Sequence, residues 1–524
     1  MKTSNKGQEK RKMAKSNCKR RDFLKAAGFG TAAIAWWGCA DASGLFGSNN
    51  SSNRPNIIFC LADDWSWPHA GIAGDKVVKT PTFDRVSREG VLFKNAFVSA
   101  PSCTPSRGAI LTGQWHWRLE EGGNLWSTLP EKFDVYPDML ENAGYHIGLT
   151  RKGWGPGRDE PGGRKRNPAG PQFDNFRLFL ESRPQGKPFC FWFGSTDPHR
   201  DYNWQSGLKS GMKIENVKVP ACLPDSEEVR TDICDYYWEV QRFDTEVGQL
   251  LKILEDNDEL ENTLVVISGD NGMPFPRCKS NLYDLGTNVP LAVRWPARVK
   301  VGRVVDDFIS LADLAPTFLE AAGLKPTVQM TAKSFLNVLT SDKSGRVDSK
   351  RNHVLTGKER HVPGQQTGMG GYPMRAIRTH DFLYIRNFKP DRWPAGAPKG
   401  YAQPVDITVS RPRGTHYGYA DVDASPTKSF MLKYRDDPKV KKLFELAFGR
   451  RPAEELYDLR KDTAQLNNVA DHPDYAKVKS KLAADLVAEL KATKDPRVIG
   501  NGDVFDTYPY YGVMPDSKPA GTNR

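Results

Sequence analysis

Apolar and polar residues alternate in blocks along most of the chain. Apolar runs of five or six residues that end at polar or turn-forming residues are typical of buried strands. Apolar residues recur at helical spacing from Ile233 to Leu254, which predicts one long amphipathic helix. A second helix is predicted over 136–143. The predicted strands are 57–61, 146–150, 188–193 and 263–268. Strands that alternate with helices predict an α/β fold with a large, mostly parallel sheet flanked by helices.

The pattern changes near residue 375. Strand-like segments at 382–387 and 454–459 are followed by a helical pattern from 475 to 492, which predicts a smaller C-terminal α+β unit. A chain of 524 residues has room for one large and one small domain. The predicted division is 55–374 for the large α/β domain, 375–497 for the α+β unit and 498–524 for a loosely ordered tail.

Basic residues are concentrated at the N-terminus. Residues 1–39 carry ten Lys or Arg against Glu9 and Asp22, which is a net +8 of the chain's total of +12. The rest is only mildly basic, so we do not expect a nucleic-acid partner. The segment 19–25, KRRDFLK, resembles a twin-arginine export signal, and the apolar stretch 26–37 after it is too short to span a bilayer. We expect export to the periplasm, the cell surface or the medium.

Two outcomes of signal removal stay open. Cleavage before Cys39 would create a lipid attachment site, and the Ser/Asn-rich segment 40–54 would then form a flexible linker. Trp36 is unusual in a lipoprotein signal, so ordinary cleavage near this point is the alternative. A lipid anchor at Cys39 is the one membrane contact that we expect.

The segment 103–107, CTPSR, resembles the sequence that sulfatase-maturing enzymes read when they oxidise cysteine to formylglycine. The hydrate of that aldehyde carries two oxygens: one can attack sulfur, and the other can re-form the carbonyl and expel sulfate, a step that no unmodified side chain offers. The sequence predicts a helix with Thr104 as N-cap, Pro105 as first helical residue and 106–112 as its first turns, and its N-terminus favours an anion such as sulfate. For Cys103 alone, a buried structural cysteine is the alternative.

Two carboxylate-rich pairs follow predicted strands. Asp63 and Asp64 come after the first strand, and Asp270 and Asn271 come after the last, so these side chains emerge at carboxyl ends, where ligands bind in open α/β sheets. With an oxygen from residue 103 they make an all-oxygen site that suits Ca²⁺, with Mg²⁺ as the second choice. Each pair taken singly is also common in turns. Their combination with the segment at 103 favours metal ligation.

Cations and one histidine complete the candidate chemistry. A transferring sulfuryl group needs cations that bear its developing charge. Arg107, one helical turn after Cys103, and the lysines Lys152 and Lys279 are the candidates. His199 follows an apolar strand and is a candidate to protonate the leaving atom, because histidine titrates near neutral pH. Solvated surface cations and an ordinary loop histidine are the alternatives.

With these residues in view, the chain resembles the formylglycine-dependent sulfatases of the alkaline phosphatase superfamily, and within them the N-sulfoglucosamine sulfohydrolase (heparan sulfamidase) branch. The segments that carry the resemblance are CTPSR at 103–107, DPHR at 197–200, DNGMPFPRCKSNLYDLGT at 270–287 and EELYDLRKDTAQLNNVA at 454–470. The resemblance implies a sulfatase catalytic domain over 55–374. The implied metal ligands are Asp63, Asp64, Cys103, Asp270 and Asn271. The implied catalytic and sulfate-binding residues are Cys103, Arg107, Lys152, His199 and Lys279.

Two positions depart from the family's pattern. Trp154 stands two residues after Lys152, where many relatives have His, and residues 196–199 are TDPH, where many have HxPH. The identity of the general acid therefore stays open, and so does the choice between sulfate esters and N-sulfo groups. Arg360 and His361 are candidates to contact an acidic sugar, with an ordinary polar loop as the alternative.

The predicted function is an exported sulfuric ester hydrolase that removes sulfate esters or N-sulfo groups from sulfated polysaccharide fragments. Its predicted requirements are a calcium ion and a formylglycine-generating or anaerobic sulfatase-maturing enzyme. One alternative is a phosphomonoesterase or phosphodiesterase of the same superfamily, although few histidines lie beside the Asp motifs to hold zinc. The other alternative is a glycan-binding surface lipoprotein without catalytic activity.

Overall fold

The computed structural model describes residues 54–398 and 418–512. The predicted export signal, the lipid site at Cys39 and almost all of the predicted linker lie outside these residues, as does the end of the predicted tail. Among the helices described, none is both long and apolar enough to cross a lipid bilayer.

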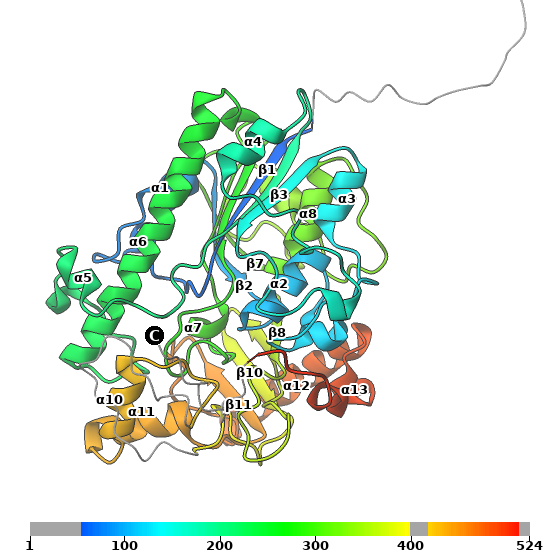
Figure 1. Ribbon diagram of the computed structural model, residues 1–524. Coiled ribbons are helices and arrows are strands. Elements are labelled where there is room, and N and C mark those ends of the chain that lie inside the picture. The colour runs from blue at the N-terminus through cyan, green and yellow to red at the C-terminus, as the bar shows by residue number, and fades with distance from the viewer. Residues whose placement is uncertain (1–53, 399–417, 513–524) are drawn as a thin grey trace, which may run out of the picture. The chain divides into compact units, whose positions relative to one another are not determined.

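The larger sheet has seven strands, and most of them are parallel (Figure 1). Strand β6 is antiparallel to both of its neighbours, β5 and β2, while the other neighbouring pairs are parallel. Their order is β3 (His146–Arg151), β4 (Phe189–Gly194), β1 (Asn56–Ala62), β5 (Thr263–Gly269), β6 (Leu291–Arg294), β2 (Val91–Phe97) and β7 (Arg303–Ser310). The predicted α/β class and its mostly parallel sheet are confirmed.

Helices cover both faces of this sheet, as Figure 1 shows. Strand β1 is buried throughout: Ile58 and Cys60 belong to one hydrophobic core, and Ile57 and Phe59 belong to another. Successive side chains of a strand point to opposite faces, so an apolar run of this kind supports two helix layers. One core includes α1 (Pro81–Arg88) and α6 (Glu227–Asp256), and the other includes α2 (Cys103–Thr112), α3 (Tyr136–Asn142) and α8 (Leu314–Ala321).

The smaller sheet is antiparallel and has four strands. Its order is β11 (Glu454–Asp458), β10 (Phe382–Asn387), β9 (Met374–Thr379) and β8 (His353–Lys358). Helix α12 (Ala476–Ala492) packs on it through Leu482, Leu486 and Leu490. Strand β8 precedes residue 375, so the second sheet begins before the predicted boundary. The remaining α-helices of the described residues are α4 (Phe176–Ser182), α5 (Ser206–Lys209), α7 (Asp284–Thr287), α9 (Leu336–Leu339), α10 (Pro426–Lys433), α11 (Pro438–Phe448) and α13 (Pro496–Ile499).

Helix α2 begins earlier than its sequence predicts. Cys103 is already helical, and the N-cap residue is Ser102, so the prediction of Thr104 as N-cap is wrong. Tertiary contacts take the hydroxyls that would otherwise cap the helix: Ser102 Oγ bonds to Nδ1 of His361 at 2.8 Å, and Thr104 Oγ1 donates to the carbonyl of Pro156 at 2.5 Å. Every residue of α2 is buried, and this fixes residue 103 firmly in the core.

Candidate active site

Two neighbouring strand ends deliver the predicted carboxylates to one place. Strands β1 and β5 are parallel, and Ala62 is in register with Gly269, so the residues after each strand emerge at the same edge of the sheet. The backbone N–H of Asp270 donates to the carbonyl of Ala62 at 3.0 Å, and the N–H of Asp64 donates to Oδ1 of Asp270 at 3.0 Å. These bonds tie the two segments into one rigid base.

Helix α2 adds Cys103 to this base. Its Sγ donates to Oδ1 of Asp63 at 3.3 Å. One ligand atom from each of four buried residues lies within 4.8 Å of the others, and the four are Asp63, Asp64, Cys103 and Asp270. The structure therefore brings these four of the predicted metal ligands together, while their role as ligands stays a prediction.

Asn271 completes the cluster. Its Nδ2 donates to Oδ1 of Asp64 at 2.6 Å, while its own Oδ1 is buried and accepts no hydrogen bond from the described residues. A buried acceptor without a donor costs free energy, and beside three carboxylates a cation is the group that would satisfy it. Carboxylate and amide oxygens are the donors that Ca²⁺ and Mg²⁺ prefer, so the residues present fit such an ion.

Asp64 is held in a backbone conformation that side-chain-bearing residues rarely adopt. Its φ is +77°, in the left-handed region. Besides the bond from its own N–H to Asp270, its carboxylate accepts from Nζ of Lys279 at 2.7 Å, so contacts on both sides hold the strained residue. A strained backbone conformation persists only where surrounding contacts hold it, and such residues are common at functional sites.

The three predicted cations surround the carboxylates. Arg107 is fully buried and donates from Nε to Oδ2 of Asp270 at 2.7 Å and from Nη1 to the carbonyl of Lys152 at 2.8 Å. Nζ of Lys152 donates to Oδ2 of Asp63 at 2.5 Å, and Lys279 reaches Asp64. The site thus pairs a cation with each carboxylate, which is how buried charges are tolerated.

These charges set the ionisation of the site. Burial raises the pKa of the Cys103 thiol well above its usual range, and the Asp63 carboxylate raises it further. Burial also acts to raise the pKa of Asp63, but Lys152, His199 and Arg107 outweigh burial and hold it well below its ordinary value. An unmodified Cys103 is therefore a protonated thiol at neutral pH, and a thiol is a poor nucleophile.

The predicted histidine His199 lies at the edge of the cluster. Its Nε2 is 4.0 Å from Oδ2 of Asp64, and its side chain is 37% exposed. Its Nδ1 hydrogen-bonds to the carbonyl of Arg200, which orients the ring. A ring that is fixed on one side and open on the other can exchange a proton with a bound molecule.

The neighbours Arg360 and His361 separate in space. His361 is buried beside Ser102, and burial lowers the pKa of its imidazole to about 4. The structure thus brings His361 next to the residue that precedes Cys103. The guanidinium of Arg360 instead donates to the carbonyls of Tyr508 and Pro509, each at 2.8 Å, and is not brought to the cluster. Substrate contact by either residue stays a prediction.

One residue of the site has no signal in the sequence. Oδ2 of Asp423 lies 3.3 Å from Nζ of Lys279, the same ammonium that bonds to Asp64. Asp423 follows no apolar run and belongs to no recognised segment, so only the tertiary fold places it here.

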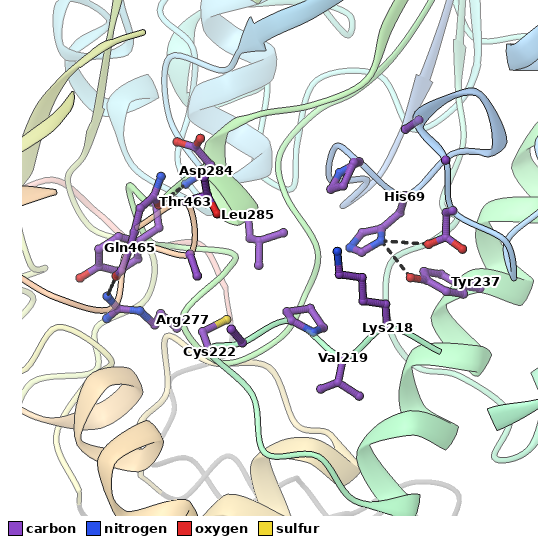
Figure 2. Close-up of a pocket in the computed structure, with 18 of the residues that line it drawn as sticks. His69, Lys218, Val219, Cys222, Tyr237, Arg277, Asp284, Leu285, Thr463 and Gln465 are labelled. Carbon is purple, nitrogen blue, oxygen red and sulfur yellow. Dashed lines mark hydrogen bonds and ion pairs between the residues drawn. The ribbon is translucent and has the colours of Figure 1, made fainter. Parts of the chain in front are cut away.

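A cavity of about 570 Å³ lies apart from the cluster (Figure 2). Its lining includes His69, Lys218, Cys222 and Arg277, and it includes none of the four clustered side chains. Figure 2 shows the His69 ring held on one side by Tyr237, whose hydroxyl is 3.0 Å from Nδ1. This cavity is therefore not the place where the candidate chemistry gathers.

Comparison with known proteins agrees with this geometry. The family model Sulfatase matches residues 55–324, which is more than half of the chain, and the model N-sulphoglucosamine sulphohydrolase, C-terminal matches residues 278–388. The chain belongs to the sulfatase family. It is a sulfuric ester hydrolase with an α/β fold like that of alkaline phosphatase.

Individual relatives extend over most of the chain. An ulvan-active sulfatase of Formosa agariphila is 27% identical and covers 84% of this chain and 76% of its own length. Human N-sulphoglucosamine sulphohydrolase is 26% identical and covers 86% of this chain and 93% of its own. The solved structure of a putative sulfatase from Bacteroides fragilis has a TM-score of 0.61 at 18% identity, covering 87% and 99% of the two chains, and shows the same fold.

Proposed function

We propose that this sulfatase is an exported enzyme that removes sulfate esters or N-sulfo groups from fragments of sulfated polysaccharides. It would act through a formylglycine made from Cys103, beside a calcium ion. The observation that carries the proposal is the placement of Cys103 at the start of α2, with Sγ 3.3 Å from Asp63 and within one ion's reach of three carboxylates. Relatives named for ulvan and for N-sulphoglucosamine support a sulfated carbohydrate as substrate.

Oxidation of Cys103 would resolve a mismatch in the site. A buried, protonated thiol beside hard oxygen donors is neither a good nucleophile nor a preferred ligand for calcium. A formylglycine hydrate supplies an oxygen that attacks sulfur and a second oxygen whose return to the carbonyl releases sulfate. A formylglycine-generating or anaerobic sulfatase-maturing enzyme would have to act before the core closes around residue 103, because every residue of α2 is buried.

Asp63, Asp64, Asp270 and Asn271 would hold the calcium ion, with magnesium as the second choice. When bound, the ion would offset negative charge on the sulfate oxygens. Lys152 and Lys279 stand on either side of the carboxylate pair, where their ammonium groups can bind the same anion.

His199 is the proposed general acid. Its side chain is 37% exposed, more than that of Lys152 at 18%, so it can meet the leaving oxygen or nitrogen. His361 is neutral at physiological pH because burial lowers its pKa to about 4, and its Nδ1 is already bonded to Ser102. We therefore assign proton delivery to His199 and a supporting position beside α2 to His361.

The test of this function combines chemistry with mass measurement. The full chain, co-expressed with a maturation enzyme, is incubated with 4-nitrophenyl sulfate, 4-nitrophenyl phosphate and a panel of sulfated sugars from heparin, carrageenan and ulvan. We expect sulfate release that a chelator abolishes, and an aldehyde mass on the peptide that holds residue 103. Faster release of phosphate would replace the proposal with a phosphatase, and an intact thiol after co-expression would favour a glycan-binding protein without catalytic activity.

Export is a separate part of the proposal and has its own test. The segment 19–25 supports it through its resemblance to a twin-arginine signal. Replacing Arg20 and Arg21 by Lys should retain the protein in the cytoplasm, as cell fractionation would show. Cys39→Ala should remove any incorporated fatty acid, and unchanged labelling would exclude lipidation at Cys39.

A further inference from the structure

A loop of the C-terminal unit, residues 418–425, is fixed by two buried lysines. Lys358 and Lys428 are 2% and 0% exposed, and burial lowers the pKa of both, that of Lys428 to about 7. Lys358 pairs with Asp421. Lys428 donates to the carbonyls of Gly418, Tyr419 and Val422 at 3.2, 3.0 and 2.8 Å. Burying an ammonium is costly unless it is fully paired, so this bracing keeps the loop in one conformation.

The far end of the loop is tied to the segment that carries His199. Oγ1 of Thr427 donates to Oδ2 of Asp232 in helix α6 at 2.6 Å. The same carboxylate accepts two bonds from Arg200, at 2.7 and 2.9 Å. The loop after residue 418 and the loop after His199 therefore share one anchor and keep a fixed relation to each other.

This construction places Asp423 beside Lys279. Its side chain is 27% exposed, so a bound molecule can reach part of it, and its Oδ2 lies 3.3 Å from Nζ of Lys279. That oxygen is itself buried and accepts no hydrogen bond from the described residues. Burial acts to raise the pKa of Asp423, but Lys279, His199 and His361 outweigh burial and hold it far below its usual value. The carboxylate is ionised and can only accept hydrogen bonds.

We infer that Asp423 is a specificity-determining residue. Its carboxylate accepts a hydrogen bond from a hydroxyl or N–H of the sugar beside the scissile group, and it disfavours sugars that carry a second sulfate at that place. The substrate class is thus a sugar with a hydrogen-bond donor next to the group that is removed. The inference rests on the proposed function and deepens it.

The negative charge of Asp423 accounts both for the preference for a hydrogen-bond donor and for the exclusion of a second sulfate. Lys279 binds the anion that is cleaved, so a carboxylate 3.3 Å from its ammonium lies within the space of the adjoining sugar group. A hydroxyl or N–H that meets the exposed part of this side chain can donate to the carboxylate, whereas a sulfate there meets a like charge. A competing role is that Asp423 only holds Lys279 in position, and that role would affect every substrate equally.

The experiment measures competition, so that each sugar reports on the site whether or not it is cleaved. Wild type, Asp423→Asn and the control Asp436→Asn hydrolyse 4-nitrophenyl sulfate in the presence of calcium. Asp436 is 91% exposed in the same unit and gives the same change of charge. Two pairs of inhibitors are compared: glucosamine N-sulfate with glucosamine N,3-O-disulfate, and N-acetylgalactosamine 4-sulfate with its 4,6-disulfate.

We expect the monosulfated member of at least one pair to inhibit wild type at a concentration about tenfold lower than its disulfated partner. In Asp423→Asn that ratio should fall to about threefold or less, while Asp436→Asn keeps the wild-type ratio. An unchanged ratio in Asp423→Asn, even with slower turnover, would overturn the inference, as would equal inhibition by both members in wild type or no inhibition by any sugar. Absence of 4-nitrophenyl sulfate hydrolysis in wild type is a different result, because it rejects the proposed function itself.

Discussion

Nε of Arg107 donates to Oδ2 of Asp270 at 2.7 Å, and both side chains are fully buried. This bond joins the helix that begins at Cys103 to the strand end that carries Asp270 and Asn271, two of the proposed metal ligands. Nη1 of Arg107 also donates to the carbonyls of Lys152 and Gly153, at 2.8 and 2.9 Å. One guanidinium thus fixes three chain segments relative to each other, so its geometry is as important as its charge.

Arg107→Lys should therefore be strongly impaired although it preserves the charge. A lysine has one ammonium and cannot reach Asp270 and the two carbonyls together, so buried acceptors are left unsatisfied. We expect kcat to fall by tenfold or more, and the free energy of unfolding to fall by about 1–3 kcal/mol. Steady-state kinetics and thermal unfolding measure the two effects. Arg88→Lys, at a site that is 66% exposed, is the matched control, and equal behaviour of the two variants would refute the role of Arg107.

Lys279→Ala should reduce turnover by about two orders of magnitude or more, by analogy with the loss of one charge-stabilising donor. The ammonium bonds to Asp64 and lies beside Asp423, so its removal also leaves two carboxylates without their cation. The measurement is kcat on 4-nitrophenyl sulfate, with Lys252→Ala, 65% exposed on α6, as the control. Turnover within threefold of wild type would show that Lys279 does not contact the reacting sulfate.

Calcium should stabilise the folded chain as well as activate it. The unpartnered Oδ1 of Asn271 and the three carboxylates gain a partner when an ion binds, and a ligand that binds only the folded state stabilises it by about 2.7 kcal/mol at one hundred times its dissociation constant. We expect a rise in melting midpoint with Ca²⁺ that is larger than with Mg²⁺.

Asn271→Ala tests whether that effect comes from the predicted site. The variant should need at least about tenfold more calcium for the same shift, because it lacks one oxygen donor. Asn257→Ala, exposed at the end of α6, should respond as wild type does. A calcium response that is identical in all three proteins would place the ion elsewhere.

The cluster that could hold a metal ion was predictable because its signal is local. Asp63, Asp64, Asp270 and Asn271 directly follow apolar runs, and parallel strands bring their carboxyl ends to one edge. Asp423 could not be foreseen, since its position depends on buried lysines and on an anchor in another helix. The prediction of Thr104 as N-cap of α2 was wrong for a related reason. Its sequence favours Thr104 as a cap, but the hydroxyls of Ser102 and Thr104 form hydrogen bonds with residues distant in sequence.

Arg360 and His361 are adjacent in sequence, and their positions in the fold could not be predicted from it either. Both are polar residues that lie two and three positions after the end of strand β8, and nothing in the sequence tells which of them faces the site. The fold turns His361 toward Ser102 and turns Arg360 toward the carbonyls of the C-terminal segment. The partners of both are remote in sequence, so only the three-dimensional structure separates a candidate site residue from a structural one.

Arg360→Met should loosen the C-terminal segment. The guanidinium satisfies the carbonyls of Tyr508 and Pro509, and its loss should cost about 1–3 kcal/mol and speed proteolysis near residue 508. Limited proteolysis and thermal unfolding check this, with Arg435→Met, on the partly exposed turn after α10, as control. A tenfold rise in KM for an acidic sugar with no change in unfolding would instead support direct substrate contact by Arg360.

Glu239→Gln should change how stability depends on pH. Burial, together with the Asp197 carboxylate, raises the pKa of Glu239 to about 7, against the partial opposition of Arg242. A carboxyl whose pKa is raised by folding stabilises the protein most when it is protonated, so its contribution is present below the unfolded value near 4.5 and is lost as pH rises through about 7.

Gln cannot ionise. The free energy of unfolding of Glu239→Gln minus that of wild type should therefore be larger at pH 8 than at pH 5. Each pKa unit is worth about 1.4 kcal/mol, and solvent reaches this site through its partner Arg242, which is 48% exposed, so we expect a gain of only about 1–2 kcal/mol. Thermal unfolding at both pH values measures it, with Glu227→Gln on the exposed first turn of the same helix as the control. If the difference between Glu239→Gln and wild type is the same at pH 5 and pH 8, then Glu239 is ionised throughout this range and is paired more tightly with Arg242 than the geometry indicates.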